Sequence, residues 1–155
     1  MGLCACPRDV LKIHIDSETA DIDTESLGKY EYNLKFPVKK NNYKKIILYI
    51  DNFQIQTKGL GNLSYVLSSN MIEYNSYNSK TKGTNNVLAV LLADATATGR
   101  TNDFTLSYSN STAPIEIQNI PELLQINITD IDGTAISFAN ANNMWALDIR
   151  FECFY

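Results

Sequence analysis

The sequence predicts an all-β protein, folded as a sandwich of antiparallel sheets. Three observations support this prediction. Apolar and polar residues alternate over many short segments, turn-forming residues separate these segments, and no stretch shows a sustained helical period with caps at both ends. About eight to ten segments have the length and regularity of strands, which is the number expected for a sandwich or a barrel. With 155 residues, the chain is long enough for one domain with its own core.

The most regular segment is the last one, residues 144–155. Successive side chains of a strand point to opposite faces, so this segment has one apolar face and one charged face. The charged positions are Asp148, Arg150 and Glu152, and the apolar row is Trp145, Leu147, Ile149, Phe151, Cys153 and Tyr155. Burial of that row contributes on the order of 10 kcal/mol, and ordering the backbone costs a comparable amount. We therefore expect a central strand, covered by an opposing apolar layer.

The other strands are expected from the same alternation. The longest, residues 46–57, has an apolar face of Ile47, Tyr49, Phe53 and Ile55, interrupted by Asp51. The remaining strands are expected at residues 11–15, 30–36, 65–74, 87–93, 104–108, 115–117, 124–129 and 135–138.

Three of the connecting or unusual segments carry more specific predictions. Residues 87–93 are continuously apolar, which is typical of a strand in the middle of a sheet or covered on both faces. Residues 75–86 are expected to form a polar turn region. The pair Asp132-Gly133 predicts a two-residue hairpin that leads into the segment 135–138.

Composition excludes several classes of function. The net charge of −4 and the pI near 4.9 argue against nucleic acid as the main partner. No apolar run approaches the roughly 20 residues of a membrane span, and no signal-peptide pattern begins the chain. The three cysteines, Cys4, Cys6 and Cys153, do not describe a disulfide framework. This cysteine usage fits synthesis in a reducing intracellular compartment.

The residues that carry chemistry are few. His14 is the single histidine and falls on the polar side of a predicted strand, so we expect a surface residue and not a catalytic base. The cysteine spacing matches no zinc pattern. Asp130 and Asp132 resemble only part of a calcium loop, and the hairpin interpretation is favoured. The sequence therefore predicts no catalytic, cofactor-binding or metal-binding residues, and a protein that is not an enzyme.

Two segments remain open to more than one interpretation. The acidic residues of segment 16–25 form either a solvated loop or a calcium site. At the N-terminus, Gly2 with Cys4 and Cys6 matches an acylation signal only in part, because position 6 is not Ser or Thr. We favour an N-terminal arm, residues 1–9, that lies along a neighbouring subunit, followed by a single domain at residues 10–155.

Two groups of segments resemble a known family. The first contains Asn70-Met71-Ile72-Glu73-Tyr74-Asn75-Ser76, Asn78-Ser79 and Asn85-Asn86-Val87-Leu88-Ala89-Val90. The second contains Pro121, Leu124, Ile126, Ile128, Asp130, Asp132-Gly133, Trp145-Ala146-Leu147 and Phe151-Glu152. Their order is similar to that in the single jelly-roll minor capsid and penton proteins of large DNA viruses. The resemblance covers roughly residues 45–155, and the first forty residues carry none of it.

The resemblance implies a single jelly-roll β-sandwich of about eight strands in two antiparallel sheets. It also implies a viral structural protein of the virion, a minor capsid or penton (vertex) component that associates with itself and with other capsid proteins. We expect the contacts to come from the N-terminal arm, the sheet edges and the loops at residues 75–86 and 95–103. Because nine tyrosines also suit sugar binding, the alternative is a carbohydrate- or receptor-binding sandwich, such as a fibre head or lectin-like module.

Overall fold

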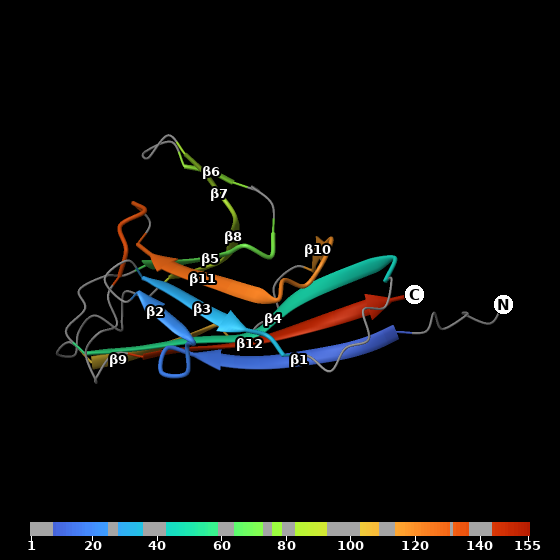
Figure 1. Ribbon diagram of the computed structural model, residues 1–155. Coiled ribbons are helices and arrows are strands. Elements are labelled where there is room, and N and C mark those ends of the chain that lie inside the picture. The colour runs from blue at the N-terminus through green and yellow to red at the C-terminus, as the bar shows by residue number, and fades with distance from the viewer. Residues whose placement is uncertain are drawn as a thin grey trace.

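The computed structural model (Figure 1) describes residues 8–24, 28–35, 43–58, 64–72, 76–78, 83–92, 103–108, 114–130, 132–136 and 144–155. These residues form strands and connections without any helix, and hence without a helix that could cross a membrane. The strands are β1 (Arg8–Asp16), β2 (Ile22–Thr24), β3 (Lys29–Asn33), β4 (Lys45–Lys58), β5 (Ser64–Ser69), β6 (Ser76–Asn78), β7 (Gly83–Asn85), β8 (Val87–Leu92), β9 (Asp103–Tyr108), β10 (Ile115–Ile117), β11 (Leu123–Thr129) and β12 (Met144–Phe154).

The strands lie in two five-stranded sheets and one separate hairpin. Sheet A has the order β1-β12-β4-β10, and β9 also pairs with β4. Sheet B has the order β2-β3-β11-β5-β8. The hairpin β6–β7 belongs to neither sheet and projects away from both (Figure 1). Within sheet A, β10 pairs with the start of β4 and β9 with its end, so these two short strands share one place beside β4.

The connectivity is that of a jelly roll. The first strand pairs with the last, β1 with β12, and inside this pair β3 meets β11, β4 meets β9 and β10, and β5 meets β8. All these pairs are antiparallel, so the chain is one long hairpin rolled up until β12 also meets β4 and β11 meets β5. Apart from β2 at the edge of sheet B, each sheet has four places. This confirms the predicted sandwich of about eight strands.

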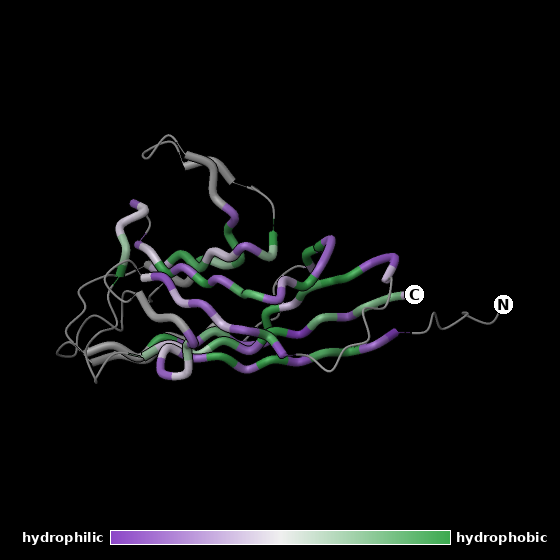
Figure 2. The backbone as a smooth tube through the Cα atoms, viewed as in Figure 1, coloured by the Kyte–Doolittle hydropathy of each residue, from purple (hydrophilic) through white to green (hydrophobic). Residues whose placement is uncertain are grey.

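The last strand is central, as predicted. β12 lies between β1 and β4, and the inner row of β12 from Trp145 to Cys153 is at most 1% exposed. Figure 2 shows green and purple alternating along the strands of this sheet. The expectation for Tyr155 was wrong, because this residue lies one position beyond β12 and is 44% exposed.

A β-bulge corrects the predicted face of β4. Asp148 is paired with Asn52 and Ile149 with Ile50, so Asp51 has no partner of its own on β12. One extra residue reverses the alternation, and the buried side chains are Ile46, Leu48, Ile50, Phe53 and Ile55. Ile47 and Tyr49, which were expected inside, are half-buried on the outer face.

The apolar run at residues 87–92 is an edge strand, so the expectation of a central position or of cover on both faces was wrong. β8 pairs only with β5 in sheet B, and Val90 is 42% exposed. The register of this pair shifts between Leu67 and Ser68, and the consecutive residues Leu88 and Ala89 are both buried. A bulge therefore accounts for an uninterrupted apolar run at the edge of a sheet.

Two predicted turns differ from the structure in detail. A turn does follow β11, but Thr129 bridges Ala135, so five residues connect them instead of two. Asp130 organises this turn, because its Oδ1 accepts the backbone N–H groups of Asp132 and Thr134 at 2.9 and 2.8 Å. The segment 75–86, expected to be a polar turn region, contains the hairpin β6–β7. Strands β3 and β5 end at Asn33 and Ser69, earlier than expected.

The core joins the two sheets through aromatic contacts. Trp145 of sheet A meets the rings of Tyr30 and Tyr32 of sheet B edge to face, with centroid distances of 5.1 and 6.2 Å. Such pairs contribute about 0.5–1.5 kcal/mol beyond the area they bury. Trp145 is thus the side chain by which the closing strand holds the opposing sheet.

Candidate interaction surface

The last two residues of the predicted N-terminal arm lie in strand β1. β1 begins at Arg8, so Arg8 and Asp9 belong to sheet A. Residues 1–7 lie outside the described part of the chain, and so do residues 95–102 of the loop expected to make contacts. The expected contact loop at residues 75–86 contributes the projecting hairpin (Figure 1). On sheet A the surface features with described side chains are its outer face, its edge strand β1 and the end at which β12 ends.

A charged network covers the outer face of sheet A. The Arg150 guanidinium holds Asp51 with Nε–Oδ distances of 3.1 and 3.3 Å, and its Nη1 is 2.8 Å from Glu152 Oε1. Arg8 reaches the other oxygen of Glu152 at 3.3 Å. The guanidinium also stacks over the Tyr49 ring, 4.2 Å from its centroid. The hydrogen bonds that Arg150 donates to Asp51 raise the pKa of Arg150.

This network is partly desolvated. Glu152 is only 8% exposed although it lies on the outer face, because arginine side chains cover it from both sides. Arginine and tyrosine are the residue types enriched at the centres of protein interfaces. The face therefore has the chemistry of a contact surface.

His14 lies on the same outer face, in the position predicted for it. Its Nδ1 is 2.6 Å from Asp148 Oδ1, and its Nε2 is 3.9 Å from Asp16 Oδ2. The side chain is 61% exposed. A serine or cysteine nucleophile would have to stand within hydrogen-bond reach of the imidazole, and the polar groups recorded beside it are carboxylates. His14 and Asp148 thus form an exposed side-chain contact between β1 and β12.

The acidic segment after β1 uses its described carboxylates to hold the backbone. Asp16 Oδ1 accepts the N–H groups of Glu18 and Thr19, each at 2.9 Å, and Asp21 Oδ2 accepts the N–H of Asn33 at 2.6 Å. Among the described residues no three His, Cys, Asp or Glu side chains come together in a way that could hold a metal ion. Asp23 and Glu25, which the calcium interpretation would also need, have no described side chains.

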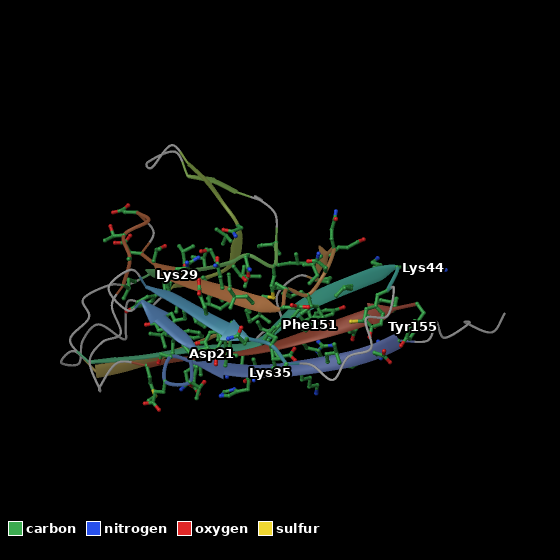
Figure 3. All side chains as sticks on the ribbon, in the orientation of Figure 1. Asp21, Lys29, Lys35, Lys44, Phe151 and Tyr155 are labelled. Carbon is green, nitrogen blue, oxygen red and sulfur yellow. The ribbon has the colours of Figure 1, made fainter. Side chains whose placement is uncertain are left out.

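At one end of sheet A, hydrogen bonds join three residues that the sequence did not group together. The Asp9 Oδ2 atom accepts hydrogen bonds from Tyr43 at 2.8 Å and from Tyr155 at 2.5 Å. The two rings lie 5.3 Å apart, and Figure 3 shows Tyr155 and Lys44 at the same end of the molecule. We call Asp9, Tyr43 and Tyr155 the terminal cluster. No local pattern predicts it, because its members are 34 and 146 positions apart.

Two hydrogen bonds and burial set the ionisation of the terminal cluster. The bonds from Tyr155 and Tyr43 lower the pKa of Asp9. Burial, together with the nearby Asp9 carboxylate, raises the pKa of Tyr43. Cys153 lies beside the cluster as a buried free thiol, and its burial raises its pKa. At neutral pH Asp9 is therefore a carboxylate, and Tyr43 and Cys153 are protonated.

Exposed apolar side chains in the described chain lie on edge strands and at strand ends. Val10 is on β1, Val90 is on β8, Met144 begins β12 and Tyr155 follows it, and they are 37–45% exposed. Both edge strands named here pair with a neighbour on one side only. Open edges with apolar side chains are sites at which another chain can add.

Comparisons with known proteins add no family. No family model matches this chain, and no curated protein matches it. Among solved structures, the Drosophila NLP core, described with its pentamer formation and histone binding, aligns with a TM-score of 0.32 and 11% identity over 96% of this chain and 98% of that one.

Two virus structures also align. Tomato aspermy virus gives a TM-score of 0.32 and 17% identity over 97% of this chain and 80% of that one. The extra small virus of the prawn Macrobrachium rosenbergii gives 0.24 and 14% over 98% and 82%. These scores are too low to argue from, so the jelly-roll assignment rests on the strand order.

Proposed function

We propose that this protein is a structural subunit of a virus particle, which acts by assembling with copies of itself and with other capsid proteins. The observation that carries the proposal is the pairing of the first strand with the last, which makes a jelly roll. Its two sheets have edge strands at β1 and β8. The exposed valines of these edges and the arginine–tyrosine face of sheet A are suited to contact with other chains. A protein with this role needs no catalytic centre.

The finer proposal is a minor capsid or penton component of a large DNA virus, located in the virion. Its support is the resemblance of the segments 70–90 and 121–152, which lie in and between β5, β8, β11 and β12. Because one sandwich fold hosts many functions, this assignment needs a test of partners. Co-expression with a double-jelly-roll coat protein encoded nearby should give a co-purifying complex if the protein is a vertex or minor capsid component.

The mass of the purified full-length chain in solution tests the general proposal. We expect light scattering and native mass spectrometry to show a defined oligomer whose population grows with concentration. Electron microscopy of the same sample should show closed rings or larger assemblies. A chain that stays monomeric at high concentration, and that binds glycans on an array, would contradict the proposal and favour the carbohydrate-binding alternative.

A further inference from the structure

β1 is the open edge of sheet A. Over its nine residues it pairs on one side with β12, and no described strand pairs with its other side, where the Tyr32 hydroxyl donates to the Asp16 carbonyl at the end of the strand. Such an edge presents a row of N–H and C=O groups that another strand can pair with. The question is which strand fits it.

Lys12, in the middle of this edge, has no acidic partner among the residues that the structure describes. Its residue directly opposite on β12 is Arg150, whose guanidinium is already held by Asp51 and Glu152. Like charges directly opposite each other destabilise a sheet. No ion pair joins Lys12 to an acid in the part of the chain that the structure describes. The edge therefore carries a cation that an acid from outside would stabilise.

Asp16 is such an acid, and it lies on the same edge and the same face. It is four positions from Lys12, and residues an even number apart share a face of a strand. Its Oδ1 is occupied by the turn at residues 18–19, whereas its Oδ2 lies 3.9 Å from His14 Nε2. Its side chain is 29% exposed. β1 thus has a base, Lys12, two positions before His14, and an acid, Asp16, two positions after it.

We propose that β1 pairs antiparallel with β1 of a second copy around a two-fold axis at His14. This register sets Lys12 opposite the copy's Asp16 and, by symmetry, Asp16 opposite the copy's Lys12. On the inner face it sets half-buried Ile13 against Ile15 of the copy, which extends the apolar layer. The two copies of sheet A become one continuous sheet. The inference rests on the proposed function and names one of its contacts.

A rival register is less favourable. Centring the axis on Lys12 would pair Arg8 with the copy's Asp16, but Arg8 is already bound to Glu152 at 3.3 Å. It would also place Lys12 directly against Lys12, which costs stability. The two registers bring different residues to the axis, so cross-linking distinguishes them.

Cysteines at the axis test the pairing directly. In the full-length chain with Cys4→Ser and Cys6→Ser, and with buried Cys153 retained, His14→Cys should form a disulfide-linked dimer on mild oxidation. Residues facing each other across an antiparallel pair have Cα atoms about 4.5–5.5 Å apart, which a disulfide can span. The matched variant Lys12→Cys should stay monomeric on a non-reducing gel. Cross-linking of Lys12→Cys alone, or of neither variant, would overturn the proposed register.

Charge exchange is the second test. Lys12→Glu and Asp16→Lys should each weaken self-association about tenfold in sedimentation velocity, because two opposite-charge pairs become like-charge pairs. An equimolar mixture should regain it, because every pair across the mixed axis is again complementary. The control Lys44→Glu, which lies just before β4 and not on β1, should leave association unchanged. Asp16→Lys removes the acceptor of the turn at residues 18–19, so circular dichroism must show that this variant is folded. If it is not, the loss of association in Lys12→Glu alone tests the pairing.

The outcomes separate the two proposals. If the unmodified chain does not self-associate, the proposed function fails and the β1 pairing fails with it. If the unmodified chain self-associates, but the charge variants associate equally well and His14→Cys does not cross-link, only the β1 pairing fails. Cross-linking at position 14 together with rescue in the mixture would establish it.

Discussion

Arg150 and Asp51 meet on the outer face of sheet A because β4 carries one extra residue where they meet. The Arg150 Nε lies 3.1 Å from Asp51 Oδ2, and Asp51 is the bulged residue between Ile50 and Asn52. Without the bulge, the alternation that buries Phe53 and Ile55 would turn Asp51 to the inner face as well. The bulge thus does two things at once. It restores the apolar alternation for Phe53 and Ile55, and it supplies the acid that anchors Arg150.

The first prediction concerns this anchor. Asp51→Ala should lower the free energy of unfolding by about 1 kcal/mol, because Arg150 loses its two-pronged partner but keeps Glu152 and Tyr49. Urea unfolding at low and at high salt measures this loss of stability, which should be smaller at high salt. Glu116→Ala removes the more exposed pair with Lys45 and serves as the control, with a change within about 0.5 kcal/mol. Equal losses in both variants would show that the bulge does not organise the network.

The second prediction concerns Gly28, just before β3. Its φ is +59°, and a Cβ there would lie 2.5 Å from the carbonyl oxygen of Ile128. Gly28→Ala should therefore cost about 2–3 kcal/mol, from backbone strain and from the clash. Gly133 also has a positive φ, 86°, but lies in an exposed turn, so Gly133→Ala should cost only about 1 kcal/mol from backbone strain. Thermal unfolding compares the two, and a loss at Gly28 no larger than that at Gly133 would remove the role of the close approach.

The sequence predicted most of the fold because each strand buries one face. The alternation in residues 144–153 was sufficient to identify a central strand, and the jelly-roll order agrees with the family resemblance. The errors fall where one residue breaks the period. At Asp51 the buried positions change from even (46, 48, 50) to odd (53, 55), but residues 46–50 are all apolar, so the sequence did not show this change of parity.

The contact surface was less predictable, because its parts come together only in space. The terminal cluster joins a residue of β1 to a residue before β4 and to the last residue of the chain. The absence of an acid for Lys12 likewise depends on the register of β1 with β12, which sets Arg150 opposite it. Sequence patterns give the faces of strands, but not the register between strands distant in the chain.

The third prediction concerns the contribution of Trp145 to the packing of the two sheets. Trp145→Ala should cost about 3–5 kcal/mol, because a fully buried side chain that contacts Tyr30 and Tyr32 leaves a cavity between the sheets. Trp145→Phe should cost less, since it keeps an aromatic ring in the cavity. Chemical denaturation followed by circular dichroism gives both values. Val10→Ala, on the exposed edge, is the control and should change stability by less than about 0.5 kcal/mol. A Trp145→Ala protein as stable as this control would contradict the central role of β12.

The fourth prediction is a dependence of stability on pH at both ends of the scale, arising from the terminal cluster. The pKa of Asp9 is lowered on folding, so its contribution is present above the unfolded pKa of about 3.9 and is lost as pH falls through the folded pKa. The pKa of Tyr43 is raised on folding, so its contribution is present below about pH 10 and is lost as pH rises above that value. Asp9→Asn should flatten the acid loss in urea unfolding, and Tyr43→Phe should flatten the alkaline loss. Asp132→Asn, in an exposed turn, should leave both limbs as in the unmodified chain. If Asp9→Asn has the same acid limb as the unmodified chain, the two tyrosine hydrogen bonds do not stabilise the carboxylate in solution.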